Sequence, residues 1–315
     1  MVQRATGVNA KLYAKMETTY GAIATGDYQQ MPFVTCELGA DQPLEANDVL
    51  GLGREASPPS RGLITAGGSI VVPVDLQAFG FWMKLLLGPP TTTGSGSNYT
   101  HVFVTGAETL PSATVEVGFP QVSSFFQNTG CMVDSIKFPW STSGKVNATI
   151  AIIAQGEAKT TTSQAGTPTK QPLKRFFQSM GSIKLGGSAL GSITGAELTL
   201  GNGLDPVRTI RDDGKIDGCD LGVATAVGQI NARFADTILL DAATSGDSVA
   251  LSIGWKITLD RSLVVDLPSV YLPRTKRQIN GPKGIEMRFN FQCAHEADST
   301  DPLCTVTLKN DVATY

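Results

Sequence analysis

The alternation of apolar and polar positions predicts a chain built mainly of β-strands. Apolar residues recur at about every second position over residues 113–119, 146–152, 248–258, 262–267 and 285–291. This is the period of a strand that turns one face toward a core. The apolar run at residues 70–74 predicts a further, more fully buried strand.

Two stretches show helical spacing instead. Apolar residues recur every three or four positions between Leu76 and Leu87, Asp75 is a suitable N-cap, and Gly88 followed by Pro89 ends the pattern. A shorter helix is expected at residues 235–246, where Asp236 can cap the start and Gly246 the end.

One long stretch occurs twice along the chain. Residues 37–70 match residues 197–230 without a gap when the numbering is shifted by 160. Eight positions are identical, where about two are expected by chance at average composition: Glu37/Glu197, Leu38/Leu198, Leu44/Leu204, Gly62/Gly222, Thr65/Thr225, Ala66/Ala226, Gly68/Gly228 and Ile70/Ile230. A second, shorter match aligns IKFP (136–139) with VYLP (270–273).

The repeat predicts a mainly β chain of two tandem, duplicated domains of β-sandwich or β-barrel type. We expect the first domain at residues 1–158, a polar linker at 159–173 and the second domain at 174–315. Each domain has one flanking helix and a long irregular loop, at 41–62 and at 201–222. Ordered loops of this length are uncommon in compact domains and are usually functional.

The composition excludes several kinds of protein. A net charge of −3 and a charged fraction of 17% argue against nucleic-acid binding through a basic face. No apolar run reaches the roughly 20 residues of a transmembrane helix. The five cysteines are odd in number and form no CxxC pair, so we expect reduced, mostly buried thiols and no zinc site.

Candidate catalytic residues are scarce. His101 lies in a strand-like stretch, and His295 lies two residues from Cys293, which by itself makes neither a metal site nor a catalytic pair. Neither a nucleophile elbow nor a phosphate-binding loop is present. The acidic stretch 212–220 is either a solvated loop or a calcium loop, although it lacks EF-hand spacing. We therefore expect no enzyme and no cofactor.

Several segments resemble tail tube proteins of long-tailed, non-contractile bacteriophages. They include AKLYAKMETTYGA (10–22), GSIVVPVDLQAFGFWMKLLLG (68–88), YTHVFVTGAETLPSATVEVGF (99–119), DPVRTIRDDGKIDG (205–218) and VTLKNDVATY (306–315). The resemblance implies a structural virion protein, assembled in the host cytoplasm, whose domains form six-membered rings that stack into a tube around a lumen. It also implies the partners: further copies of the chain, the tape measure protein, a terminator and baseplate proteins. The resemblance further implies that genomic DNA passes through the lumen without specific binding.

The duplication modifies what the resemblance implies. If each chain supplies two tube-type domains, three chains complete a pseudo-hexameric ring, because closure fixes the number of domains rather than of chains. We expect the two long loops to contact the next ring through their charged residues: Asp48, Arg54, Glu55, Arg61, Arg208, Arg211, Asp212, Asp213 and Lys215. Alternating strands such as 113–119 and 285–291 are candidates to face the lumen.

Two alternative functions remain open. The protein could be another ring-forming tail component, such as a terminator or baseplate protein, or a host- or carbohydrate-binding β-module with an exposed aromatic platform.

Overall fold

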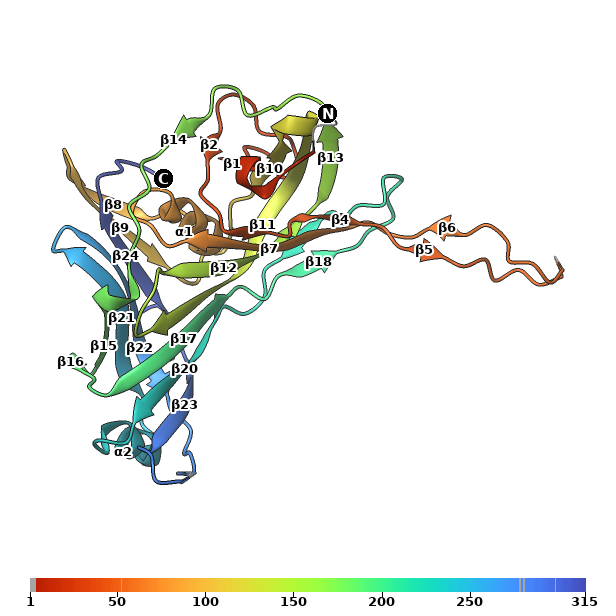
Figure 1. Ribbon diagram of the computed structural model, residues 1–315. Helices are drawn as coiled ribbons and strands as arrows, with labels where there is room; N and C mark the ends of the chain where they lie inside the picture. Colours follow the sequence, from red (N-terminus) through yellow and green to blue (C-terminus); the bar gives the residue numbers. More distant parts are fainter. Residues whose placement is uncertain (1–3, 52, 278, 280, 298) are drawn as a thin grey trace.

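The computed structural model describes the whole chain except residues 1–3, 52, 278, 280 and 298, and it is mainly β (Figure 1). The strands of the first half are β1 (Lys11–Met16), β2 (Gln29–Gln30), β3 (Thr35–Cys36), β4 (Gly39–Asp41), β5 (Leu44–Glu45), β6 (Ser60–Arg61), β7 (Thr65–Pro73), β8 (Thr91–Ser95), β9 (Asn98–Val104), β10 (Ala113–Phe119), β11 (Ser124–Ser141), β12 (Asn147–Ala154) and β13 (Gly156–Thr160). Helix α1 (Phe79–Leu87) follows β7.

The second half has a similar order of elements. Its strands are β14 (Thr169–Lys170), β15 (Gly181–Leu185), β16 (Ser188–Ala189), β17 (Ile193–Gly201), β18 (Asp205–Val207), β19 (Gly218–Asp220), β20 (Thr225–Arg233), β21 (Val249–Thr258), β22 (Arg261–Tyr271), β23 (Glu286–Cys293) and β24 (Thr305–Asn310). Helix α2 (Ile238–Ser245) follows β20. The strands predicted from alternation are therefore confirmed, with ends that differ by a few residues.

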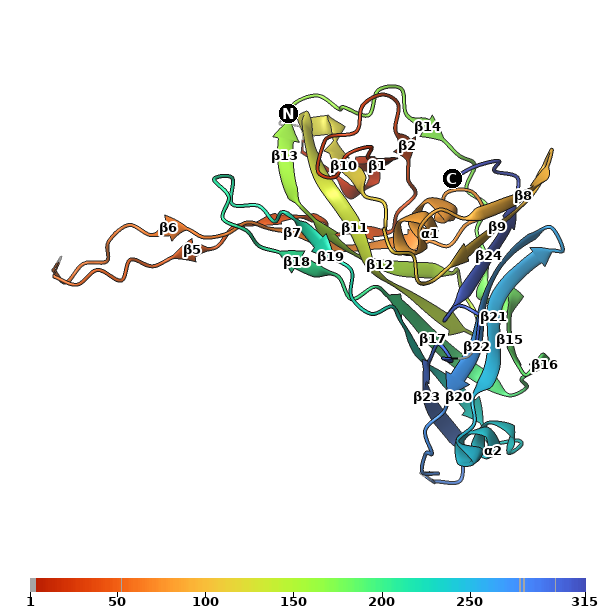
Figure 2. The ribbon, with the colours of Figure 1, turned by 180° about the vertical axis from the view of Figure 1, so that it is seen from behind.

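Strand β11 joins two regions of sheet. Its first part pairs with β10 and β13, near β1 and β2, and its second part pairs with β12 and then with β17 of the second half. In the second half, β17 pairs with β20, which pairs with β23. Strand β9 of the first half also pairs with β24 of the second. Figure 2 shows how this long strand runs from the upper group of strands into the lower sheet.

One hydrophobic core extends through both halves of the chain. It contains aromatic residues from each, including a parallel stack of Trp140 and Trp255 with ring centroids 4.5 Å apart. Phe176 lies beside Trp255 and is buried between the halves, while the adjacent Phe177 is exposed. The predicted linker contributes the end of β13 and all of β14.

Helix α1 is buried on almost every side because it packs against β9, β11 and the side chain of Tyr315. Eight of its nine residues are buried, and Gly80 faces the ring of Tyr315, where a Cβ atom would lie 2.3 Å from the ring. The prediction that Asp75 caps this helix is wrong. The N-cap is Ala78, and the Asp75 Oδ1 atom instead accepts from the backbone N–H groups of Gln77 and Ala78 in the turn before the helix. Gly88 ends the helix as predicted.

Helix α2 is more exposed, and only Leu239 and Ala243 are buried. Its N-cap is Thr237, one residue after the predicted Asp236, whose Oδ1 atom accepts from the Ile238 N–H group. Gly246 ends the helix in the left-handed conformation, as expected for a glycine at this position.

The proposal that β10 alternates between a core and an open face is wrong for this chain. Its residues are buried on both faces, and the Glu116 carboxylate accepts from the Ser163 hydroxyl at 2.5 Å and from the Gln164 N–H at 2.8 Å. The segment after β13 therefore covers the polar face. Strand β23 does alternate between buried and exposed residues.

The two matching stretches form hairpins of identical register. Gly39 pairs with Gly67 in the first hairpin, and adding 160 to both numbers gives Thr199 and Val227, which pair in the second. Gly68 and Gly228 lie at equivalent places, and an added Cβ atom would lie 2.2 Å and 2.1 Å from the carbonyl oxygens of Glu37 and Glu197. Glycine is required at both positions because the neighbouring strand approaches so closely.

Candidate assembly arms

The first long loop is an extended β-hairpin rather than an irregular loop. Its strands β5 and β6 pair Leu44 with Arg61 and Glu45 with Ser60, beyond the end of the β4–β7 hairpin. We call residues 42–62 the first arm. In Figures 1 and 2 this arm is the thin orange hairpin that projects away from the rest of the molecule.

The side chains of the first arm are exposed almost throughout. Asp48, Arg54 and Glu55 lie beyond the paired strands, and Arg61 lies in β6, so all four predicted contact residues face solvent. A hairpin that buries so little cannot be held in place by hydrophobic packing within its own chain. It therefore has the geometry of an element that binds another molecule.

The second long loop, residues 202–222, forms a second arm with the same register. Asp205 pairs with Asp220, which are the positions of Glu45 and Ser60 shifted by 160. Unlike the first arm, this second arm packs against its own chain. Its Gly214 carbonyl accepts from the N–H of Ile64 at 3.2 Å, and Ile216 is buried.

The charged residues of the second arm form a local cluster. The Arg211 guanidinium donates to the Asp213 carboxylate at 2.9 Å and to Asp217 at 2.8 Å. These hydrogen bonds lower the pKa of Asp213. Arg208 and Asp212 are exposed beside the cluster, and the Lys215 side chain lies over Gly156 of β13. Arg211 thus pairs with two of the four aspartates in the acidic stretch that also suggested a calcium loop.

Exposed apolar residues on the arms are a feature that charge patterns did not reveal. Leu50 on the first arm is 93% exposed, and Ile210, its equivalent on the second arm, is fully exposed. Val49 and Leu44 are also more than half exposed. The signal in the sequence is that an apolar residue occupies the same position in both copies, within otherwise polar segments.

The two histidines have structural surroundings. His101 is buried in β9 and hydrogen-bonds Thr92, Asn310 and the Val312 carbonyl. Burial lowers the pKa of His101, which favours the neutral ring. His295 is exposed and donates to the Asp301 carbonyl.

Other kinds of site find no support in the described part of the chain. No group of three or more His, Cys, Asp or Glu side chains is placed to hold a metal ion there. The stacked tryptophans Trp140 and Trp255 are buried and form no exposed platform for a sugar. All five cysteines are free, and Cys131 and Cys304 are buried. Neither helix of the described residues has the length and apolar character that a membrane crossing requires.

A comparison with known families decides between the remaining possibilities. The model of the family described as phage tail tube protein matches residues 7–293. The chain belongs to the phage tail tube protein family. A search of curated proteins found no match.

Family membership assigns this tail tube protein to the virion. Members are structural components of the phage tail, not enzymes, and they associate with further copies of themselves to form a tube.

Proposed function

We propose that this tail tube protein is a tandem duplication and that three copies form a pseudo-sixfold ring. The observation that carries the proposal is the common register of the two hairpins and of the two arms at a separation of 160 residues. Similar sequence alone requires no common pairing, whereas a duplicated domain does. Residues 1–158 and 174–315 are the two repeats, and closure of the ring needs six such domains.

Rings of this kind stack into the tube, and the arms contact the neighbouring ring. The first arm supports this role because it is long, exposed and carries both charged and apolar residues. Exposed ion pairs contribute at most about 1 kcal/mol each and mainly fix the relative orientation of partners. Exposed residues such as Leu50 and Val49 supply the apolar area that stable association requires.

The assembled tube conducts the genomic DNA during ejection. The tape measure protein, a terminator and baseplate proteins are its further partners. A lumen with few positive charges releases few counterions on contact with phosphate, so DNA slides instead of binding. The net charge of −3 is compatible with such a lining.

Two experiments test the proposal. The mass per ring, from electron microscopy of assembled tubes, should correspond to three chains of 33.2 kDa. A ring mass near six chains would overturn the trimer. Separately, replacement of residues 46–59 by Asn-Gly keeps the Glu45–Ser60 pair and closes it with a two-residue turn. We expect folded chains that form no long tubes.

A point variant sharpens the second experiment. Leu50→Asp places a charge on the first arm, and Val8→Asp is its control, since Val8 is also 93% exposed but lies in an N-terminal turn. Tubes should be lost with the first variant and retained with the second. Normal tubes from both the shortened arm and Leu50→Asp would show that the arm does not join rings.

A further inference from the structure

One of the contacts between the two halves of the chain is a strand pairing with a defined register, and β9 with β24 forms another. Residues 135–141 of β11 pair antiparallel with residues 195–201 of β17, from Ser135–Gly201 to Ser141–Gly195. An ion pair between Lys137 and Glu197, 2.9 Å long, crosses this contact. Each of these two strands has an equivalent strand elsewhere in the chain. A second contact of the same kind could therefore form between those equivalents.

Strand β22 is the equivalent of β11. Met132 pairs with Ile153, and adding 139 to both numbers gives Tyr271 and Gln292, which pair between β22 and β23. Both strands also carry a register shift against the preceding strand. It lies between Ala113 and Val115 on β10 and between Val249 and Leu251 on β21.

Continuing this register identifies the counterpart of residues 135–141. Ser135 corresponds to Arg274, Lys137 to Lys276 and Trp140 to Ile279. Strand β11 has a register shift at Asp134, and the residue equivalent to Asp134 is Pro273. Proline has no N–H group to donate, so in a sheet it is found at irregularities of this kind. The short IKFP and VYLP match in the sequence suggests another alignment, but the observed strand pairing requires this one.

Strand β4, together with the residues before it, is the equivalent of β17. Among the described residues β4 pairs with β7 alone, whereas β17 pairs with β20 on one side and β11 on the other. Glu37 donates its N–H to Ser69 on β7, so by alternation the backbone groups of Leu38 and Ala40 point to the open side. An open edge of this kind is a template for another strand.

We propose that the segment after β22 of one chain pairs with the β4 edge of the next chain and repeats the β11–β17 contact between chains. The register follows from the two offsets: Arg274 lies opposite Asp41, Lys276 opposite Gly39, and Ile279 opposite Cys36. The occupant of the edge is thus a second copy of this protein. The inference rests on the proposed ring and specifies how its chains join.

Charge complementarity supports this pairing. The Lys137–Glu197 ion pair has as its equivalent Lys276 of one chain and Glu37 of the next. Arg274 and Asp41 are opposite in charge and face one another directly. Glu157 of β13 lies next to Gly39, within 3.4 Å of an added Cβ atom, so Lys276 meets a second carboxylate there.

The exposed side chains of the segment also indicate an unfilled contact. Trp140, in the contact within the chain, is 6% exposed, whereas its equivalent Ile279 is 75% exposed. Pairing with the next chain buries Ile279 against Cys36. On the other face Phe138 is replaced by Arg277, so charge contributes more and apolar burial less than within the chain. We therefore expect the contact between chains to weaken with salt.

Each chain carries one copy of each edge, so the contact is head-to-tail. Contacts of this type generate closed rings or open helices, and never isolated symmetric dimers. The step between chains repeats the step between the two halves of one chain. This equality is what allows three chains to close a ring with six equivalent domains.

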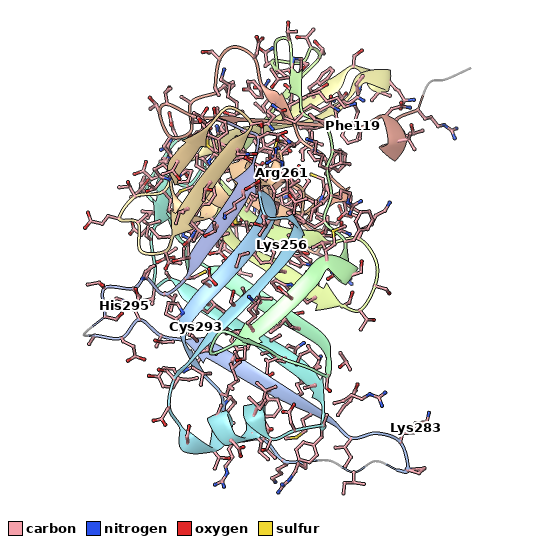
Figure 3. The ribbon with its side chains drawn as sticks, turned by 90° about the vertical axis from the view of Figure 1, so that its left-hand side faces the viewer. Phe119, Lys256, Arg261, Lys283, Cys293 and His295 are labelled. Atoms are coloured by element: carbon pink, nitrogen blue, oxygen red, sulfur yellow. The ribbon has the colours of Figure 1, made fainter. Side chains whose placement is uncertain are left out.

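Charge reversal tests the ion pair at the new contact. Lys276→Glu and Glu37→Lys should each abolish rings at a concentration where the unaltered protein is fully assembled, and the double variant should restore them. Lys283→Glu is the control, since Lys283 lies on the loop before β23, outside the predicted pairs (Figure 3). Thermal unfolding of each variant separates loss of assembly from loss of fold.

A disulfide tests the register. The double variant with Arg274→Cys and Asp41→Cys places two thiols directly opposite one another, at a non-hydrogen-bonded position of the strand pair. Cα atoms at such a position are about 4.5 Å apart, which is close enough for a disulfide bond. Mild oxidation should yield covalent trimers. Arg277→Cys with Asp41→Cys, which places the thiols on opposite faces, should not. Each single-cysteine variant controls for the native thiols.

The outcomes separate this inference from the proposed function. If the unaltered protein forms rings, but both charge reversals leave them intact and the variant with Arg274→Cys and Asp41→Cys does not cross-link, the strand assignment is wrong and the ring stands. If the unaltered protein forms no rings or tubes, the proposed function and this inference are both wrong.

Discussion

Lys137 and Glu197 form an ion pair across the line where the two halves of the sheet meet, with Nζ and Oε2 2.9 Å apart. Strands β11 and β17 bring them together. Both side chains are partly solvent-exposed, at 49% and 32%, so water and salt screen their attraction.

Removing this ion pair should have a small effect on stability. We expect Lys137→Ala to lower the free energy of unfolding by about 0.2–1 kcal/mol, the range of exposed pairs, as measured by urea denaturation. Lys256→Ala is the control, because Lys256 is exposed on β21 and forms no ion pair with the described residues. A loss above about 2 kcal/mol would show that the pair holds the halves together far more strongly than its exposure suggests.

Gly68 and Gly228, which lie at equivalent positions of the two hairpins, should not tolerate a side chain. A Cβ atom at either position would lie within 2.2 Å of a backbone carbonyl oxygen, and a strand rather than a flexible side chain would have to shift. We expect Gly68→Ala and Gly228→Ala each to destabilise the fold by about 1–3 kcal/mol or more, measured by thermal and urea unfolding. Gly191→Ala is the control, since nothing lies within 4 Å of its added Cβ.

The buried Asp75 should make stability depend on pH. Burial raises its pKa from 3.8 to about 6, although hydrogen bonds from Ala78 and Gln77 and the charge of Arg175 oppose the rise. Between these pH values the folded chain retains a proton that the unfolded chain has released, so stability falls as the pH rises through this window. The contribution amounts to about 3 kcal/mol.

Asp75→Asn removes this titration while retaining an oxygen for the two backbone N–H groups. The difference in unfolding free energy between the unaltered chain and the variant should shift by about 3 kcal/mol in favour of the variant between pH 3 and pH 7. Urea denaturation at a series of pH values provides the measurement. A constant difference across this range would contradict the assigned pKa.

The thiols of Cys131 and Cys304 should be unreactive in the folded chain. Both are buried, and burial raises their pKa, so little thiolate forms. A thiol-specific reagent should modify them only at the rate of unfolding, and complete denaturation should release five reactive thiols. Rapid modification of either residue in the native chain would contradict their placement in the core.

The regular elements could be predicted because each has a periodic apolar pattern. Strands β10, β21 and β23 form where the sequence alternates, and α1 forms where the apolar residues have helical spacing. What the pattern could not show is which segment covers a strand. Glu116 is polar and therefore predicts an open face, yet the Ser163 hydroxyl from a distant segment covers it.

The arms illustrate a second limit of sequence reasoning. The β5–β6 pairing involves Leu44 and Arg61, both exposed, so no apolar period marks it as a hairpin. The sequence repeat located both arms and their charged residues, but charge alone did not distinguish a free arm from a packed one. That difference depends on contacts such as Gly214 with Ile64, which lie far apart in the chain.

The continuity of β11 has a mechanical consequence. This single strand of 18 residues passes from one region of sheet into the other without a loop between them. A force that pulls the two halves apart along the strands loads the seven β11–β17 residue pairs in shear, together with the β9–β24 pairs, so the pairs of each contact must fail together rather than one after another. In the proposed ring, no strand of this length runs continuously from one chain into the next, so we expect the wall to open first at the junctions between chains.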